Sequence, residues 1–440
     1  MALPEEMNYS QHIDSMGIKK DRIGLAPNNG SSFICNTGYL NFEVPCQQFS
    51  KFADFANAYI AFDVTNTDAT ANAFHGQLGT IALQNKLTVE TTSNKKFSEV
   101  DNVNALWDIK LSQSVDPDWY QSNGALMFGT GDGPFDGVSI GAGAGNARHY
   151  IMPLGMSGLC DNTYVPLIGR ENLRFRIDLE QASTALIAST DGLADSEITL
   201  SNVVMYYDVM TLSDEQMKGL LNAIGGKFIM SGIDYYHQNA QIALASTSGN
   251  ISIGCSRRKA KKLIGCFRTV GDMTDDEVNS FSRNKANLTE ITVKHNGQKI
   301  GQTDLPLNAN TAPEAYAEAM KASQGGLLNL HSTSLGEVKT LVLAEGAPNT
   351  ISYTYTDVFN LDEGDATSNI TSGKFFFEVD LTSGMETKDS VSGLNVMTGN
   401  FNLEFQKGAT TADQYLDIFI EYHSEYVLDM QAGGTWMVYN

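Results

Sequence analysis

The sequence predicts an all-β chain made of two similar β-sandwiches in tandem, and three observations support this fold class. Short runs rich in Val, Ile, Phe and Tyr recur between clusters of Gly, Ser, Thr, Asn and Asp. Helix patterns are few. An order of strand, turn-rich loop, strand and long closing strand occurs once in each half of the chain. Many short strands with Gly-rich turns are typical of sandwiches and barrels.

The predicted strands alternate apolar and polar residues. In residues 172–179, Leu173, Phe175 and Ile177 are separated by charged residues, which places one face of the strand on a core. The other predicted strands cover 39–44, 59–64, 202–210, 291–295, 374–381, 400–405 and 417–428.

Three segments have helix patterns. The clearest is 213–224, where Ser213 is a candidate N-cap, two acidic residues follow and Gly225 is a natural stop. A second is 313–322, which has proline in its first turn. A third is 48–56, where phenylalanine recurs every third residue.

The two halves of the chain have similar segments in the same order. Residues 172–180 (NLRFRIDLE) correspond to 374–382 (KFFFEVDLT), and each half ends in a long aromatic strand, at 203–210 and 418–428. We therefore predict an internal repeat. The predicted division is an N-terminal arm at 1–30, a first domain at 31–212 with loop insertions, a connecting helix and linker at 213–230, and a second domain at 231–440.

Composition limits the function. The chain has 440 residues, a net charge of -22 and 42% hydrophobic residues, which indicates a folded chain with more than one domain. No run of eighteen apolar residues occurs, and the first twenty residues lack a signal-peptide pattern. The negative charge argues against a polymerase, a nuclease or a histone-like role. The five cysteines are scattered, so we expect reduced, buried thiols.

No motif of catalysis stands out. The glycine-rich segments 129–134 and 141–146 lack the Lys-Ser/Thr of a phosphate-binding loop, so we interpret them as surface turns. The seven histidines form no HxH or HExxH spacing, and no GxSxG occurs. We therefore predict no catalytic residue, no cofactor-binding residue, no metal ligand and no cofactor.

One basic run, residues 257–262 (Arg-Arg-Lys-Ala-Lys-Lys), stands out in this acidic chain. It has two readings. The first is a nuclear-import signal or an inward patch that meets genome or lipid. The second, which we favour, is a solvated strand edge or an ion-paired subunit contact, with lysines that prevent edge aggregation.

The order of these segments resembles the double jelly-roll major capsid proteins of tailless icosahedral DNA viruses, the lineage of adenovirus-like, virophage-like, polinton-like and lipid-containing bacteriophage members. The resemblance covers nearly the whole chain and rests on 38–45 (GYLNFEVP), 165–168 with 172–179, 201–209 with 212–215, 258–268, 392–395, 399–403 and the closing strand with its Gly433-Gly434.

The resemblance implies two eight-stranded jelly-roll β-barrels with a few short helices and long loop insertions. It implies a structural, non-enzymatic protein that forms homotrimeric, pseudo-hexameric capsomers in an icosahedral virion shell, assembled in the host cytoplasm or nucleus. The implied partners are other copies of the chain, penton and minor capsid proteins, and in many members an internal membrane; no sequence-specific nucleic acid is expected. The loops 66–150 and 296–350 would form towers or subunit contacts.

A second function fits the same composition, namely a two-domain β-sandwich module of a spike or adhesin that binds a receptor or a carbohydrate. A third, a β-rich enzyme acting on glycans, would need a cleft with paired carboxylates, and acidic pairs are too frequent here to indicate one. The capsid reading requires two similar barrels, whereas the other two do not.

Overall fold

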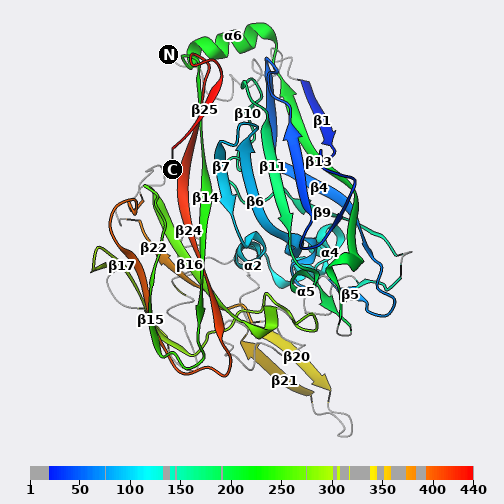
Figure 1. Cartoon of the computed structure of the whole chain (residues 1–440), viewed down its shortest axis with the longest axis vertical. Coiled ribbons are helices and arrows are strands. Elements are labelled where there is room, and N and C mark those ends of the chain that lie inside the picture. Colours follow the sequence, from blue (N-terminus) through cyan, green and yellow to red (C-terminus); the bar gives the residue numbers. More distant parts are fainter. Residues whose placement is uncertain are drawn as a thin grey trace.

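The structure is a computed structural model. It describes residues 19–74, 76–131, 139–143, 146–189, 192–273, 275–300, 305–307, 317, 337–343, 351–357, 373–382 and 393–439. Two groups of antiparallel sheets lie side by side, with one helix, α6, across one end (Figure 1).

The first sandwich consists of two facing sheets. One has the order β1-β13-β4-β10, with β2 on β13 and β9 on β4; the other has the order β3-β11-β6-β7. Their bounds are β1 Lys19–Leu25, β2 Ser32–Ile34, β3 Tyr39–Val44, β4 Lys51–Asn66, β6 Gln84–Thr91, β7 Lys96–Val100, β9 Arg148–Pro153, β10 Val165–Pro166, β11 Leu173–Leu179 and β13 Ile198–Thr211. A small third sheet joins β12 (Ile187–Ala188), β5 (Ala73–Phe74) and β8 (Ser139–Ile140).

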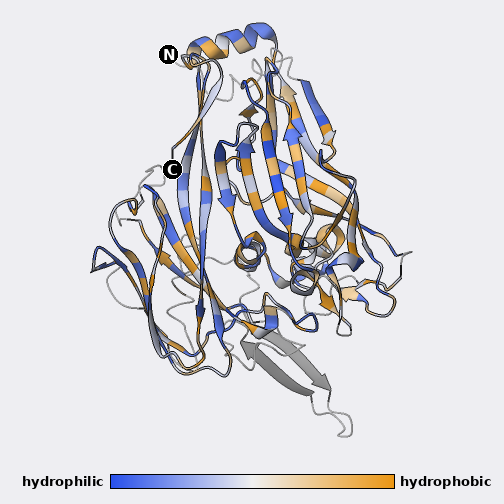
Figure 2. Cartoon of the chain, viewed as in Figure 1, coloured by the Kyte–Doolittle hydropathy of each residue, from blue (hydrophilic) through white to orange (hydrophobic). Residues whose placement is uncertain are grey.

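Alternate residues of β11 point into the core of this sandwich. Leu173, Phe175 and Ile177 are fully buried, and Phe175 lies 4.9 Å from Phe55 of the opposite sheet, centroid to centroid. The same alternation of apolar and polar residues is visible along the strands in Figure 2. The prediction of a half-buried strand at 172–179 is confirmed.

The second sandwich repeats this arrangement. Its first sheet has the order β14-β24-β16-β22, with β25 on β24, and its second has the order β15-β23-β17-β18, with β19 on β17. Their bounds are β14 Lys227–Ile242, β15 Ser248–Ser252, β16 Ala260–Thr269, β17 Leu288–His295, β18 Gln298–Lys299, β19 Leu305–Pro306, β22 Phe377–Asp380, β23 Phe401–Lys407, β24 Gln414–Asp429 and β25 Thr435–Tyr439. Phe267 and Phe405 join its two sheets, 6.3 Å apart. A separate pair joins β20 (Glu337–Leu343) and β21 (Ile351–Asp357).

The helices are short. They are α2 Val103–Ser114, α3 Pro117–Gln121, α4 Asn123–Phe128, α5 Ala182–Ala185 and α6 Asp214–Ala223, with 3-10 turns at Gly79–Leu83, Asp195–Glu197 and Gly271–Met273. The predicted helix at 213–224 is confirmed as α6, with Ser213 and Gln216 forming a capping box. In the described part of the chain, no helix is long and apolar enough to cross a membrane.

One detail of the sequence prediction is wrong, and the segments predicted as an arm and as a connector each contain strand residues. The helix predicted at 48–56 is wrong, because most of it belongs to β4. Phe55 packs on Phe175 inside the first sandwich and Phe52 packs on Phe228 of β14, so both are buried although they point to opposite faces of the strand. Residues 19–25, within the predicted arm, form a strand paired with β13. β14 begins at Lys227, inside the predicted connector. The helix predicted at 313–322 lies outside the described residues, apart from Ala317.

Candidate functional site: the interface between the two sandwiches

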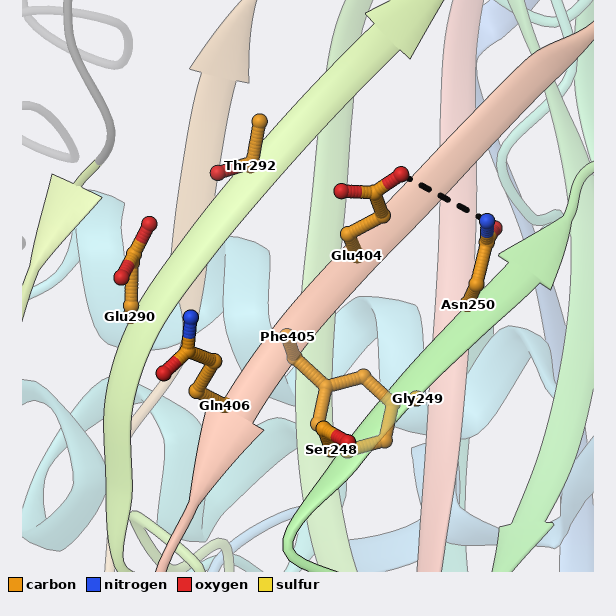
Figure 3. Close-up of a pocket in the computed structure, with 8 residues that line it drawn as sticks. All are labelled: Ser248, Gly249, Asn250, Glu290, Thr292, Glu404, Phe405 and Gln406. Carbon is orange, nitrogen blue, oxygen red and sulfur yellow. Dashed lines mark hydrogen bonds between the residues drawn. The ribbon is translucent and has the colours of Figure 1, made fainter.

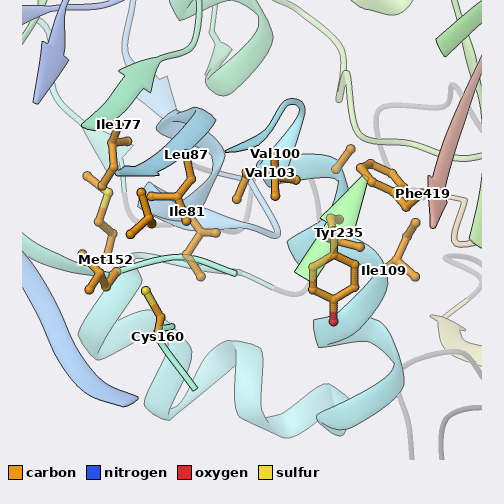
Figure 4. Close-up of a cluster of buried hydrophobic side chains, with 14 of the residues drawn as sticks. Ile81, Leu87, Val100, Val103, Ile109, Met152, Cys160, Ile177, Tyr235 and Phe419 are labelled. Carbon is orange, nitrogen blue, oxygen red and sulfur yellow. The ribbon is translucent and has the colours of Figure 1, made fainter. Parts of the chain in front are cut away.

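The hydrophobic cores of the two sandwiches are continuous through helix α2. Val103 and Ile109 of α2 lie in one buried cluster with Tyr235 of β14 and Phe419 of β24 (Figure 4). Since the residues that join the sandwiches are as buried as those inside each one, the interface resembles a domain core more than a surface contact.

Aromatic side chains extend this interface toward α6. Phe97 of β7 packs edge-on against Trp436 of β25, with ring centroids 5.3 Å apart. The ring of Tyr426 of β24 lies 5.8 Å from the ring of Phe97, centroid to centroid. Phe52 of β4 meets Phe228 of β14 at 5.8 Å. Such edge-on pairs add to the free energy gained by burial alone.

A buried polar cluster centres on Asp417 of β24. Its carboxylate accepts hydrogen bonds from Arg268 at 2.6 and 2.9 Å, from His237 at 2.8 Å and from Asn102 at 3.0 Å. Burial alone would raise the pKa of this carboxyl, but the charge of Arg268 and the bonds from His237 and Asn102 lower it to about 2. Asn102 belongs to the first sandwich and the other three residues to the second, so the cluster joins the two.

A second cluster surrounds Glu421, four residues further along β24. Lys110 of α2 donates to Glu421 at 2.9 Å, and Lys262 lies 4.0 Å away. Gln113 of α2 donates to the buried Glu378 of β22 at 2.7 Å. Burial raises the pKa of Glu378, whereas at Glu421 the charges of Lys110 and Lys262 outweigh burial and lower the pKa.

A third contact fixes the last turns of α2. Arg283 of the second sandwich is 1% exposed and pairs with Asp108 at 2.9 Å, and it donates to Ser112 at 3.1 Å. Near the other end of the interface, Asp234 of β14 accepts from the backbone of Gly158 at 2.8 Å and from the hydroxyl of Tyr426.

Together these contacts hold the two sandwiches in one relative position. A buried charge costs several kcal/mol unless it finds its partner, so each pair penalises any displaced arrangement.

The basic run 257–262 is paired within the chain. The guanidinium of Arg257 lies 4.8 Å from the ring centroid of Tyr422, Lys259 pairs with Glu425 at 2.6 Å, and Lys262 faces Glu421. The favoured interpretation as an edge strand is wrong, because β16 lies between β24 and β22. The ion pairs that it expected do occur, but inside the chain.

The histidines are dispersed in the described part of the molecule. His149 bonds Asp63 at 2.6 Å, His237 bonds Asp417, and His295 lies 3.1 Å from the carbonyl of Thr398. His12, His75 and His331 lie outside the described residues. No group of three or more metal-ligand side chains occurs among the residues that the structure describes.

The glycine segments are partly described. Gly129 ends α4 with a left-handed φ of 74°, and Gly143, with φ 96°, donates its amide to Asp68 at 2.7 Å. Both glycines therefore form turns. Residues 132–138 and 144–145 lie outside the described part.

One depression lies on the outer face of β15, β23 and β17 (Figure 3). Its volume is about 380 Å³, and it is lined by Ser248, Gly249, Asn250, Glu290, Thr292, Glu404, Phe405 and Gln406. Glu404 pairs with Lys294 at 2.5 Å and faces the amide of Asn250 at 3.5 Å. These polar groups bond one another, as on the solvated face of a sheet.

Comparison with solved structures identifies the fold. The chain is similar to VP54 of PBCV-1, as fitted into a cryo-EM reconstruction of the virophage Sputnik, over 96% of this chain and 97% of that chain, with a TM-score of 0.61 and 10% identity. The fold is a double jelly roll.

Two further matches agree with this fold. The Sputnik virophage structure covers 96% of this chain and 88% of its own, with a TM-score of 0.55 and 12% identity. The match to the Faustovirus major capsid protein covers 93% of this chain and 90% of that chain, with a TM-score of 0.51 and 10% identity. No protein-family model and no curated protein matches the sequence. The double jelly roll is thus shared without appreciable identity, and the fold class predicted from the sequence is confirmed.

Proposed function

We propose that the chain is a viral major capsid protein that forms homotrimeric, pseudo-hexameric capsomers in an icosahedral shell. One observation carries the proposal: the similarity to the Faustovirus major capsid protein and to VP54 of PBCV-1 extends over 90% or more of both chains. A binding module or an enzyme would not require two similar barrels.

The interface between the sandwiches supports this role. Three copies, each with two similar barrels held in one orientation, give six similar units around a threefold axis. A shell transmits load from one barrel to the next, so a capsomer needs barrels that do not move relative to each other. The buried charge clusters at Asp417 and Glu421 supply that constraint.

Under this proposal the chain acts by assembly and not by catalysis, and its location is the virion. Its partners are other copies of itself, neighbouring capsomers, penton and minor capsid proteins, and an internal membrane where the virus has one. The net charge of -22 disfavours direct binding of the genome. We keep the division into an arm at 1–30, a first domain at 31–212, a connector at 213–230 and a second domain at 231–440 as a proposal.

The mass of the purified protein in solution tests the proposal. Light scattering after size exclusion is expected to give three times the chain mass of 47.8 kDa, with hexagonal outlines in negative-stain images. A stable, well-folded monomer at micromolar concentration would contradict it. A monomer that also bound immobilised glycans would favour the alternative, a two-domain module that binds a receptor or carbohydrate.

A further inference from the structure

The two sandwiches share one strand order, so each surface of one has a counterpart on the other. In the first sandwich, β1, β13, β4 and β10 occupy the positions that β14, β24, β16 and β22 occupy in the second. In the other pair of sheets, β3, β11, β6 and β7 occupy the positions of β15, β23, β17 and β18. A contact made by one surface therefore indicates what its counterpart is suited to contact.

The interface inside the chain joins two surfaces whose counterparts are exposed. On the second sandwich it uses the face of β14 and β24 that points away from the core and includes Asp417. On the first sandwich it uses the edge strand β7, with Phe97, and helix α2. The counterpart of the first surface is the outer face of β1, β13 and β4. The counterpart of β7 is β18, where Gln298 and Lys299 are both exposed.

The outer face of β1, β13 and β4 lies on the side away from the second sandwich and has an aromatic centre (Figure 1). The rings of Tyr59 and Tyr206 lie 5.5 Å apart, centroid to centroid, and the guanidinium of Arg22 lies 5.9 Å from the ring centroid of Tyr59. Lys20 and Arg22 pair with Asp208 at 2.8 and 3.3 Å, and their side chains are 57% and 61% exposed. Aromatic and arginine side chains with a polar rim are typical of protein–protein interfaces.

The symmetry of a ring of six similar units connects these surfaces. In a closed head-to-tail ring, each unit offers one surface to the unit before it and a different surface to the unit after it. Inside the chain, β7 and α2 of the first sandwich meet β14 and β24 of the second. Between chains, the same pair of surfaces joins β18 of one second sandwich to β1 and β13 of the next first sandwich.

We propose that the outer face of β1, β13 and β4 binds the second sandwich of another copy of this chain, along the edge that ends in β18. The occupant is a second copy because the counterpart face on β24 is covered by the counterpart edge, β7, within one chain. This inference rests on the proposed function, since it needs the threefold capsomer, and it adds the surface through which the copies meet.

The outer face of β3 and β11 is a natural control surface. Arg176 on this face pairs with Asp178 at 2.7 Å and lies 4.5 Å from the ring centroid of Tyr39. The counterpart of this face, on β15 and β23, holds the solvated depression of Figure 3. Since neither sandwich uses this position in the interface inside the chain, we expect no contact between copies there.

Cross-linking of the full chain tests the contact. All five native cysteines are buried, so a flexible bis-maleimide reacts chiefly with engineered thiols. The double variant Lys19→Cys with Lys299→Cys is expected to give linked dimers and trimers, read by mass spectrometry after denaturation. Each single variant is expected to give none, because a residue does not meet its own copy in a head-to-tail ring. Equal linkage in the double and single variants overturns the proposal.

A matched pair of charge reversals gives an independent measure. Arg22 and Arg176 are both exposed, each pairs with an aspartate and each lies near a tyrosine ring. Arg22→Glu is expected to raise the protein concentration at which half of the trimer dissociates by at least about tenfold, and Arg176→Glu is expected to leave it unchanged. Light scattering over a dilution series measures both. Equal dissociation of the two variants contradicts the proposal.

The parent chain separates this inference from the proposed function. A monomeric parent chain overturns both. A trimeric parent chain with no cross-links between positions 19 and 299, and with equal dissociation of the two charge reversals, keeps the proposed function and overturns only the contact face.

Discussion

The long closing strands of the two sandwiches, β13 and β24, differ in what contacts the face that points away from their own sandwich core. Along β13, buried residues alternate with partly exposed ones, and Asp208 on its outer face pairs with Lys20 and Arg22 near solvent. Along β24, most residues on both faces are buried, and Asp417 and Glu421 pair with charges deep in the molecule. The same strand position thus stabilises one sandwich in the first case and joins two in the second.

The largest expected effect comes from Asp417→Ala. The variant leaves Arg268 buried without its carboxylate, so we expect a loss of roughly 3–5 kcal/mol of unfolding free energy. Asp208→Ala on β13 is the matched control and is expected to lose only about 0–1 kcal/mol, because its pairs are near solvent. Urea unfolding at fixed protein concentration measures both. Equal losses would remove the distinction between the two strands.

The next largest loss of stability is expected at a close backbone contact between the two sandwiches. Gly232 of β14 is so close to Gly158 that a Cβ on Gly232 would lie 2.1 Å from the Gly158 carbonyl oxygen. Gly232→Ala therefore forces the sandwiches apart, with an expected loss of about 1–3 kcal/mol. Gly219→Ala, in α6 with open space around it, is expected to be neutral or stabilising by less than about 1 kcal/mol. Thermal unfolding of the two variants would show opposite shifts; a matching fall in both would argue against the close contact.

Acid should weaken the Asp417 cluster of β24. The folded pKa of Asp417 is about 2, below its ordinary 3.8, so its contribution is complete above pH 4 and is lost as the pH falls from 4 toward 2. The unfolding free energy lost in this way is about 2 kcal/mol, because each unit of pKa shift corresponds to about 1.4 kcal/mol. The groups that face it are Arg268, His237 and the neutral Asn102. Glu378 acts in the opposite direction, because its raised pKa favours folding once it is protonated.

Asp417→Asn tests this assignment without a change in size. Unfolding free energies measured from pH 6 to pH 2 should fall less steeply below pH 4 in the variant than in the parent chain. An unchanged slope would place the acid sensitivity in other carboxyls.

The smallest effect is expected for the basic run. Lys259 pairs with Glu425, and both side chains are about one-third exposed, at 32% and 35%. Lys259→Ala should lose less than about 1 kcal/mol. Denaturation midpoints compared with those of Asp417→Ala would rank the two pairs. A loss as large as that for Asp417 would mean that the run contributes to the interface as much as the buried clusters do.

Local patterns predicted the strands and α6 because their signals are local. β11 alternates along one chain segment, and Ser213 with Gln216 marks the start of α6. The sequence analysis did not find α2. Both sides of α2 are covered, so Val103, Ile109, Asp108 and Gln113 are all buried and no single apolar stripe exists.

The polar clusters of the interface were also missed. Asp417 and Glu421 alternate with apolar residues, which is the pattern of a strand with one face in water. Their partners Asn102, Lys110 and Arg268 lie 149 to 315 residues away in sequence. The one available signal was the unusually apolar composition around these charges, and only tertiary structure shows that it means burial on both faces.

The large sequence separation between α2 and β24 has a consequence for synthesis. During synthesis, α2 with its Lys110 emerges from the ribosome long before Asp417 and Glu421, and so does Arg268. Until then these cations have no buried partner, and the first sandwich lacks the surface that covers α2. The nascent chain therefore cannot complete either the interface or the second sandwich before β24 has emerged.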